Sequence, residues 1–355
     1  MKKFKLGRKN ISIKNPTYFI ADIAANHDGS LSRAKKLIRL CAKAGADAAK
    51  FQHFKAETIV SDFGFKKIGK LTHQSKWKKS VFQTYKDASI DNSWTKSLKK
   101  ECSKNNIDFM TAPYDFEYVD SVNKYVDAYK IGSGDINWLE IISKISKKKK
   151  PVIVATGAST FKEVENAVKT VLKNNKKLVL MQCNTNYTNE LKNLNFINLN
   201  VLKTYKKKFQ NKLILGLSDH TPGSTSVLGA VALGARVIEK HFTDDNSRTG
   251  PDHKFSMNFK TWREMVNETR KLEQALGNGK KTIEKNEINS SKVQKRSYYC
   301  TQDIPAGTKI KKEMIFPLRP VLKNSFAPDK IKLILNKKTK KFLKSGECIK
   351  KNYIR

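Results

Sequence analysis

Eight short apolar segments recur between residues 18 and 242, and most of them are followed by a longer amphipathic segment. The apolar segments are residues 18–24, 48–54, 108–114, 128–134, 151–157, 177–183, 212–218 and 236–242. Strand–helix alternation of this kind predicts a parallel β-sheet whose strands are joined by helices. Because a (β/α)8 TIM barrel contains eight such repeats, we predict an α/β barrel for residues 1–280.

An open, doubly wound sheet is the alternative arrangement of the same elements. A glycine-rich first turn or another nucleotide-binding fingerprint would favour it, and "AANHDGS" at residues 24–30 is not one. The connection at residues 55–92 is unusually long. Connections of that length in a compact domain are commonly functional, so we expect a lid or a partner contact here.

The pattern changes after "LGNGKK" at residues 276–281. Residues 297–320 read "SYYCTQDIPAGTKIKKEMIFPLRP", in which apolar and polar residues alternate around a turn at residues 305–307. Alternation with period two is typical of short strands. We therefore predict a small β-rich domain at residues 295–355, joined to the barrel by a polar linker at residues 281–294.

The net charge of +39 comes from 71 basic and 32 acidic residues, and only ten of the basic residues are arginine. A nucleic-acid-binding protein concentrates its charge and often uses arginine, whereas these lysines are spread over predicted helical surfaces. Nucleic acid is therefore not an expected partner. A polyanion-binding protein on a barrel scaffold stays an alternative, because residues 281–355 carry 20 basic against 6 acidic residues. A positive field also favours the approach of an anionic substrate.

The five cysteines are scattered, odd in number and never spaced C-x-x-C. This usage indicates reduced thiols rather than a disulfide framework or a zinc site. The basic N-terminus is not followed by an apolar signal segment, and no run approaches the ~20 apolar residues of a membrane helix. We therefore predict a soluble, cytoplasmic protein without a membrane partner.

Polar residues gather at the carboxyl ends of the eight predicted strands, where TIM barrels carry their catalytic residues. In strand order they are Asp22, Asn26, His27 and Asp28; Lys50, Gln52 and His53; Thr111 and Tyr114; Lys130, Ser133 and Asp135; Thr156 and Ser159; Gln182, Asn184 and Tyr187; Ser218, Asp219 and His220; Glu239 and His241. Burying such groups costs free energy unless they are paired or used. The ends of the strands are therefore the predicted functional site.

Two lysines and several hydroxyl groups at one barrel mouth favour an anionic, phosphorylated ligand. The alternative for Lys50 and Lys130 is an ion pair with Asp22 or Asp135. A lone histidine at a strand end is commonly structural. His220 and His241, however, end adjacent strands about 5 Å apart, so they can share one metal ion. With carboxylates and water as further ligands, the metal would be Mn²⁺, Mg²⁺ or Fe²⁺.

The strand-end motifs occur in the order and spacing of a known family. They are "IADIAANHDGS", "AGADAAKFQHFKAETIVS", "FMTAPYD", "YKIGSGD", "VIVATGAS", "GLSDHTPG", "IEKHFT" and "GPDHKFS". On these segments the sequence resembles the sialic acid (nonulosonate) synthase family, in particular N-acetylneuraminate synthases. Residues 295–320 resemble the start of the antifreeze-like (SAF, β-clip) domain of that family.

The resemblance implies a transferase that condenses phosphoenolpyruvate with an N-acylated amino sugar (N-acetylmannosamine-like) and water, releasing phosphate. It implies a divalent metal, usually Mn²⁺, on His220 and His241, with Asp219 expected to orient His220. The phosphoenolpyruvate ligands it implies are Lys50, Thr111, Lys130, Ser133 and Ser218. The implied sugar-binding residues are Asp22, Gln52, Tyr187, Asp252 and Arg319, and the implied catalytic residues are Asp22, Asp135 and Lys50. It also implies a domain-swapped homodimer in which Arg319 reaches the partner subunit's sugar site.

The sequence departs from the family pattern at several positions. Asp22 and Asp135 stand where the family commonly has glutamate, so both carboxylates are one methylene shorter. Ala155 replaces a frequent serine, "QCNTNYT" replaces H-C-T-x-x-Y-P, and "PVLKNSFAP" at residues 320–328 lacks the expected glycines. A related phosphoenolpyruvate-dependent aldol synthase acting on another aldose therefore stays an alternative. The sequence does not choose among neuraminate-, legionaminate- and pseudaminate-type products.

Overall fold

A computed structural model describes residues 2–69, 71, 74, 75 and 77–355. The chain divides into two compact units, residues 1–277 and residues 278–355. The predicted barrel boundary at residue 280 lies close to this division, and the predicted linker at residues 281–294 falls within the second unit.

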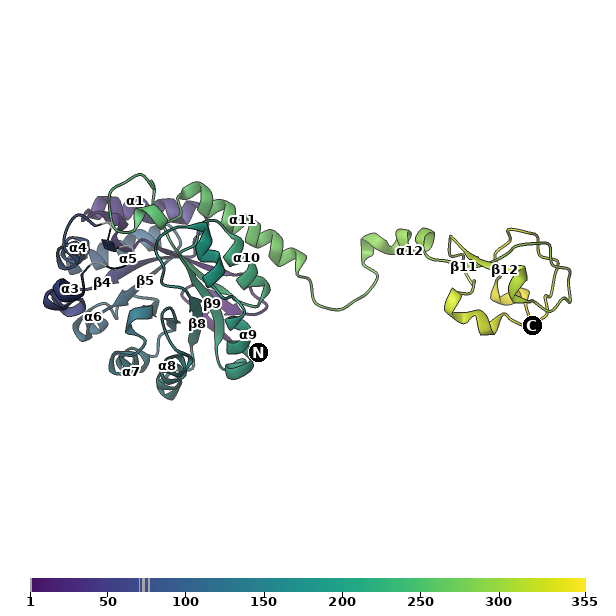
Figure 1. Ribbon diagram of the computed structural model, residues 1–355, viewed down its shortest axis with the longest axis horizontal. Helices are drawn as coiled ribbons and strands as arrows, with labels where there is room; N and C mark the ends of the chain where they lie inside the picture. Colours follow the sequence, from purple (N-terminus) through teal and green to yellow (C-terminus); the bar gives the residue numbers. More distant parts are fainter. Residues whose placement is uncertain (1, 70, 72–73, 76) are drawn as a thin grey trace. The chain divides into compact units, whose positions relative to one another are not determined.

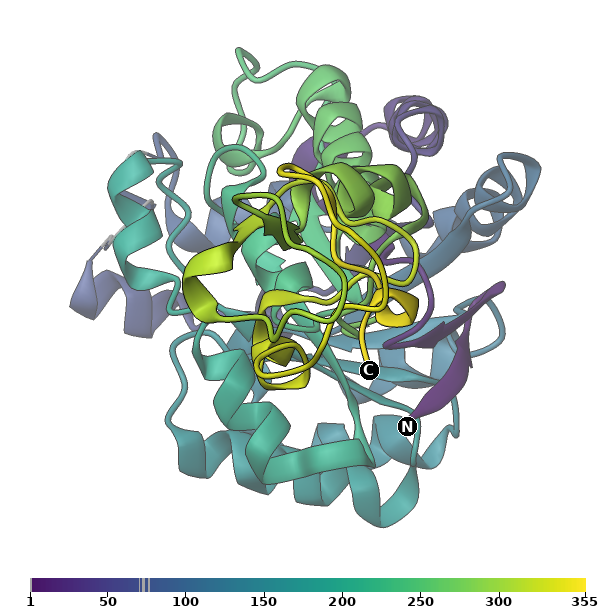
Figure 2. The same cartoon turned by 90° about the vertical axis from the view of Figure 1, so that its right-hand side faces the viewer.

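The first unit is a closed barrel of eight parallel strands (Figures 1 and 2). The strands are β3 (Tyr18–Asp22), β4 (Ala48–His53), β5 (Asp108–Pro113), β6 (Ala128–Ile131), β7 (Val152–Ala155), β8 (Leu178–Cys183), β9 (Ile214–Asp219) and β10 (Val237–His241). β10 pairs with both β9 and β3, which closes the sheet. The predicted TIM barrel is confirmed, and the open doubly wound sheet is excluded.

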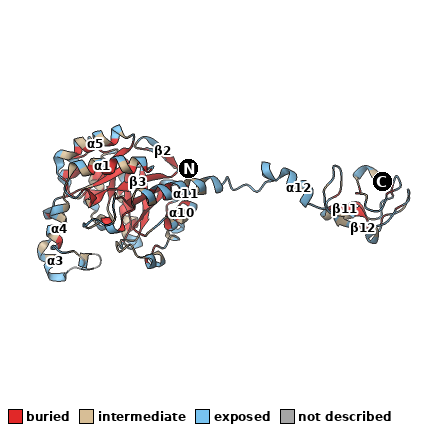
Figure 3. Cartoon of the chain, turned by 90° about the horizontal axis from the view of Figure 1, so that it is seen from above, coloured by how far each residue is buried: buried red, intermediate tan, exposed pale blue. Residues whose placement is uncertain are grey.

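Helices alternate with the strands along the chain, and most of them pack an apolar face against the barrel. They are α1 (Leu31–Lys43), α2 (Ala56–Ile59), α3 (Asp62–Ile68), α4 (Val81–Ala88), α5 (Thr95–Lys104), α6 (Phe116–Ser121), α7 (Leu139–Lys147), α8 (Phe161–Asn174), α9 (Val201–Phe209), α10 (Thr225–Ala232) and α11 (Phe259–Ala275). Their starts follow local capping chemistry: Thr160 and Glu163 form a capping box at α8, and Ser30 caps α1. The strands are buried, and the outward helix faces are exposed (Figure 3).

Successive residues of each barrel strand face opposite sides, as the pleat of a strand requires. Ile20 and Met110 pack in the cluster that fills the barrel interior. Their neighbours Phe19 and Phe109 pack in the cluster between strands and helices. Odd or even position along a strand therefore decides which polar side chains can reach the barrel mouth.

The long connection between β4 and α5 contains α2, α3 and α4, so it is not an irregular loop. Its two ends are tied together by the buried His53, whose Nε2 lies 2.9 Å from Thr95 Oγ1. Thr95 donates to the carbonyl of Asn92 at 2.8 Å, so the His53 ring nitrogen is the donor to Thr95. Four residues of this connection, 70, 72, 73 and 76, lie outside the described part of the chain.

A hairpin of β1 (Lys3–Leu6) and β2 (Lys9–Ser12) precedes the barrel and is absent from the sequence-based prediction. Phe4, Leu6 and Ile11 join the interior cluster at the end of the barrel opposite the strand carboxyl ends. The Asp108 carboxylate accepts the backbone N–H of Arg8 at 3.0 Å, which fixes the hairpin to β5. Its strands are too short and too polar to give an apolar run.

The second unit is a small β-rich fold, as predicted. It contains α12 (Ile288–Gln294), β11 (Ser297–Cys300) and β12 (Ile315–Leu318), and isolated bridges connect further extended segments. Tyr298, Ile310, Ile334 and Leu343 are among the residues of its own apolar core. All five cysteines of the chain are buried and free of disulfides. Within the described residues, no helix combines the length and apolar character needed to cross a membrane.

Leu6→Ala tests whether the hairpin closes the barrel. Leu6 is fully buried, so truncation should lower the free energy of unfolding by about 3 kcal/mol through lost burial and a residual cavity. Urea unfolding followed by circular dichroism measures the change. Leu191→Ala is the matched control, because Leu191 is 72% exposed and should change little. Equal effects of the two substitutions would contradict the assigned role of the hairpin.

Candidate active site

A cavity at the carboxyl ends of the barrel strands holds most of the predicted site residues. Its volume is about 470 Å³. The predicted residues that line it are Asp22, Lys50, Gln52, Lys130, Ser133, Asp135, Tyr187, Ser218, His220, His241 and Asp252. Barrel closure therefore brings together side chains that are far apart in sequence, at the end where TIM-barrel enzymes carry their active sites.

Glu239 is the central acid of this cavity, although the sequence-based prediction gives it no role. Its Oε1 accepts a hydrogen bond from Lys130 Nζ at 2.8 Å and one from Ser218 Oγ at 3.2 Å. The same oxygen lies 3.7 Å from Lys50 Nζ. The ion-pair alternative named Asp22 or Asp135 as the partner of Lys130. In the structure Lys130 pairs with Glu239 instead. The sequence feature that could have revealed Glu239 is its position as a charged residue inside the apolar segment 236–242.

Asp22 is the second acid of the network and links it to a histidine. Its Oδ2 lies 2.7 Å from Lys50 Nζ, 3.4 Å from Gln52 Nε2 and 3.5 Å from His241 Nε2. Strand register explains the arrangement, because Asp22 is the direct neighbour of Lys50 on one side and of His241 on the other. One level of the barrel therefore carries a carboxylate between an ammonium group and an imidazole.

The pKa shifts follow from burial and from these charges. Burial raises the pKa of Glu239, but Lys130 and Lys50 outweigh it and lower that pKa to about 2. Burial also raises the pKa of Asp22, against the opposing effect of Lys50. The pKa of Lys50 is raised, because Asp22 and Glu239 outweigh the burial of its ammonium group. Glu239 is therefore a permanent carboxylate that holds two lysines inside the protein.

Ser133 and Ser218 add hydroxyl groups beside the two lysines. Ser133 Oγ accepts the backbone N–H of Gly157 at 3.0 Å. Gly157 is required there: a Cβ on it would lie 2.5 Å from Thr185 Cγ2 and 3.0 Å from Ser133 Oγ. Ammonium groups with hydroxyl donors form a site suited to phosphate or carboxylate oxygens.

His220 and His241 face each other across the ends of β9 and β10, with ring centroids 5.4 Å apart. His220 Nδ1 donates to the carbonyl of Asn184 at 2.9 Å, which leaves its Nε2 with a free lone pair. Burial lowers the pKa of each histidine to about 3, so both are neutral at physiological pH. Tyr187 and Phe255 pack against the two rings.

These features fit a divalent metal ion. His241 Nδ1 is buried without a hydrogen-bond partner and lies 3.9 Å from Asp252 Oδ2. Neutral imidazoles are the protonation state that binds metal. Among the described residues no group of three or more His, Cys, Asp or Glu is arranged to hold a metal. A metal here would therefore have His220 and His241 as protein ligands, and its remaining positions would be open to water and substrate.

An aromatic wall forms another side of the cavity. Trp77, Tyr85, Phe54 and Tyr114 follow one another with ring centroids 6.3, 5.6 and 5.9 Å apart, and all four line the cavity. Trp77 and Tyr85 come from the long β4–α5 connection, so this connection forms part of the binding site. The sequence-based prediction placed a functional loop here without these side chains.

Models of two known protein families match this chain. Residues 37–281 match the model of the NeuB family, and residues 295–355 match that of the SAF domain. This chain belongs to the NeuB family. It is 35% identical over 341 residues to the N,N'-diacetyllegionaminic acid synthase of Campylobacter jejuni, covering 94% of this chain and 99% of that protein. It is 32% identical over 345 residues to the pseudaminic acid synthase of the same species, covering 96% and 97%.

A solved structure gives the same result for the fold of this NeuB-family chain. The crystal structure of the N-acetylneuraminic acid (sialic acid) synthetase of Leptospira borgpetersenii, in complex with citrate, superposes with a TM-score of 0.72 and 29% identity. The match covers 81% of this chain and 95% of the other. The resemblance stated from the sequence motifs is confirmed.

Thr111 does not reach the cavity of this NeuB-family barrel. It has the same parity along β5 as Phe109, so its side chain faces the helices. Its hydroxyl lies 2.7 Å from His53 Nδ1 and 3.0 Å from the carbonyl of Phe51. The inward position beside it is Ala112. The geometry therefore does not support the phosphoenolpyruvate contact predicted for Thr111.

Asp219 and Arg319 are two further predicted residues. Asp219 faces the outer side of β9, where it pairs with Lys240. Its expected role in orienting His220 stays a prediction. Arg319 is an exposed residue of the second unit. Its contact with a partner subunit stays a prediction.

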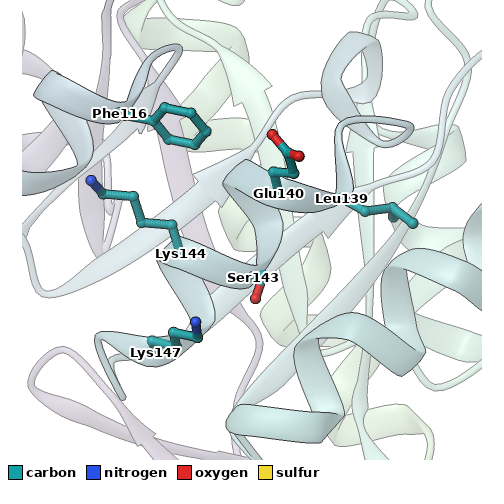
Figure 4. A pocket seen from close by; sticks show the side chains of 6 residues that line it. All are labelled: Phe116, Leu139, Glu140, Ser143, Lys144 and Lys147. Carbon is teal, nitrogen blue, oxygen red and sulfur yellow. The ribbon is translucent and has the colours of Figure 1, made fainter.

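A second cavity, of about 590 Å³, lies on the outside of the barrel between α6 and α7 (Figure 4). Phe116, Leu139, Glu140, Ser143, Lys144 and Lys147 line it. Lys144 lies 5.3 Å from the Phe116 ring centroid and pairs with Asp120 at 2.7 Å. These are surface contacts without a converging set of buried polar groups, so the smaller cavity at the strand ends is the candidate site.

Glu239→Gln tests the shared carboxylate. Removing the shared carboxylate leaves Lys130 without a counter-charge and Lys50 with Asp22 alone, so the free energy of unfolding should fall by about 3 kcal/mol. Inorganic phosphate should then raise the urea midpoint of the variant more than that of the wild type, because residue 239 no longer competes with phosphate for the two lysines. Glu165→Gln, at the surface pair with Lys208, is the control. An equal phosphate effect in both proteins would refute the competition.

Asp135→Asn tests the environment of the acid nearest the aromatic wall. Burial raises the pKa of Asp135 from 3.8 to about 6 although Lys130 opposes the shift, so the folded protein holds this proton more tightly than the unfolded chain. The stability that results is present below about pH 4 and is lost as the pH rises through about 6. The variant should therefore gain stability relative to wild type between about pH 4.5 and 7 in urea unfolding.

Asp329→Asn is the control for this pH dependence, because Asp329 is 68% exposed. It should follow the wild type at each pH. Parallel profiles of wild type and Asp135→Asn would show that the pKa of Asp135 is not raised.

Proposed function

We propose that this chain joins phosphoenolpyruvate to the open-chain aldehyde of an N-acylated amino sugar and so makes a nonulosonic acid. C3 of phosphoenolpyruvate bonds to the aldehyde carbon, the aldehyde oxygen takes up a proton, water adds to C2, and phosphate leaves C2. The observation that carries the proposal is one cavity with two lysines and two serines beside two neutral histidines. The legionaminic and pseudaminic acid synthases among its relatives support it.

The lysine side of the cavity is the proposed site for phosphoenolpyruvate. Lys50, Lys130, Ser133 and Ser218 can donate to its phosphate and carboxylate oxygens, and the two ammonium groups balance its charge. Glu239 holds both lysines in place before the ligand arrives. Such preorganised donors need little rearrangement during the reaction, and this lowers the barrier.

His220 and His241 are the proposed ligands of a divalent metal, with Mn²⁺ first and Mg²⁺ as the alternative. When bound, such an ion would polarise the aldehyde oxygen as a Lewis acid. Asp252 Oδ2 lies 3.9 Å from His241 Nδ1, and burial raises the pKa of Asp252 to about 7. Asp22, Gln52, Tyr187 and Asp252 are therefore the proposed contacts for the hydroxyl and amide groups of the sugar.

Asp135 is the proposed site of proton exchange. Its pKa of about 6 lets it hold a proton or release it near neutral pH. Tyr114 lies beside it, since a Cβ on Gly132 would be 3.2 Å from the tyrosine oxygen and 3.6 Å from Asp135 Oδ2. We also propose, from the family resemblance, a domain-swapped homodimer in which Arg319 completes the sugar site of the partner subunit.

A coupled assay tests the proposed reaction. Phosphate and a 2-keto acid should form only when phosphoenolpyruvate, an amino sugar and a divalent metal are all present. EDTA should abolish turnover, and Mn²⁺ should restore it. The sugar panel should contain N-acetylmannosamine, di-N-acylated 6-deoxyhexoses and a phosphorylated aldose, because these separate sialic-type synthases from a synthase acting on another aldose.

His220→Ala is the informative variant in this assay. It should lose metal-dependent turnover by at least 100-fold, because one of two protein ligands is gone. Activity with a normal Mn²⁺ response would show that His220 is not a ligand. The absence of product with every sugar in the panel would refute the proposed function itself.

A further inference from the structure

Lys240 and Asp219 form a buried ion pair on the outer side of the barrel, outside the cavity. Their side chains are 1% and 0% exposed, and Lys240 Nζ donates to Asp219 Oδ2. Neither the Asp219 carboxylate nor the Lys240 ammonium group faces the proposed substrates. Replacing such a pair by apolar residues is often neutral or stabilising, so fold stability is a weak reason for its presence.

The register of β9 and β10 places this pair directly behind the two histidines. Lys240 and Asp219 are cross-strand partners, and the β9–β10 pairing ends with them. His220 directly follows Asp219 at the end of β9, and His241 directly follows Lys240 as the last residue of β10. Because side chains alternate between the two faces, Lys240 and Asp219 point outward and both histidines point into the cavity.

Lys240 binds both chain neighbours of His220, Asp219 and Thr221, and Asp219 makes further bonds nearby. Asp219 Oδ1 accepts the backbone N–H of Thr221 at 3.1 Å, and Asp219 Oδ2 accepts the Ser226 hydroxyl at 2.6 Å. Lys240 Nζ donates to the carbonyl of Thr221 at 2.6 Å. The strand ladder has ended at this point, so these bonds hold the backbone of His220 where pairing between strands no longer does.

We propose that Lys240 and Asp219 are positioning residues that set the distance between the two imidazoles. Lys240 is covalently next to His241 and hydrogen bonded to residues on both sides of His220. A single ammonium group therefore connects the backbones that carry both rings. This inference rests on the proposed metal site, because the spacing of the rings matters only if they share a ligand.

The test compares two variants of the full chain after removal of metal with EDTA. Lys240→Met leaves Asp219 buried and unpaired, so it should lower both the unfolding midpoint and the affinity for Mn²⁺ alone, measured by isothermal titration calorimetry. Lys240→Met with Asp219→Asn removes both charges and should recover much of the lost stability. Its Mn²⁺ affinity should stay at least tenfold below that of the wild type, because the hydrogen bond from Lys240 to the Thr221 carbonyl is still missing.

The matched control is Lys99→Met with Asp127→Asn, which removes a Lys–Asp pair at the start of β6, the other end of the barrel. It should bind Mn²⁺ like the wild type. Wild-type Mn²⁺ affinity in the Lys240→Met, Asp219→Asn double variant would overturn the positioning role and leave the metal site standing. A wild-type protein that binds neither Mn²⁺ nor Mg²⁺ would overturn the metal site, and this inference with it.

Discussion

The carboxylate of Glu239, shared between two buried lysines, is the interaction on which the site depends. Lys50 and Lys130 are each 3% exposed, and an ammonium group at that depth needs a nearby negative charge to stay ionised. Glu239 supplies it for both, and Asp22 supplies a second charge for Lys50. Two carboxylates and two ammonium groups therefore balance, and an anionic ligand can take over part of the role of Glu239 when it binds. The anion-binding groups of the barrel are therefore already ionised before the ligand arrives.

The closed barrel turns this balance into a layered arrangement. Asp22 lies between Lys50 and His241 in register, so one layer carries charge and metal-type ligands together. Glu239 is two residues before His241 on the same strand and therefore lies one inward layer deeper. The anion-binding groups gather around that deeper carboxylate, and the two histidines lie above it at the mouth. A ligand with a charged end and a carbonyl end would place its charged end at the deeper anion-binding groups and its carbonyl end at the two histidines.

The eight apolar segments predicted the barrel, and the strand ends predicted most of the cavity wall, because both depend on local patterns. The sequence did not show which alternate residues of each strand face the barrel interior and which face the helices. Thr111 and Ala112 are adjacent letters, and only the packing of Phe109 under the helices shows that Thr111 faces outward. The same holds for Asp219, whose outward-facing side chain pairs with Lys240. The partner of Lys130 was also out of reach, since Glu239 lies 109 residues away and meets it only through barrel closure.

The acids of the cavity differ in a way that separates their roles. Lysines hold the pKa of Glu239 at about 2, whereas burial raises that of Asp135 to about 6. An acid that stays ionised at every physiological pH is a poor proton donor but a reliable counter-ion. An acid whose pKa lies near the working pH can give and take a proton with little loss in either direction. Glu239 is therefore suited to hold the lysines, and Asp135 to exchange protons with a substrate. If the two environments were exchanged, the lysines would lose their fixed counter-charge and the cavity its titratable acid.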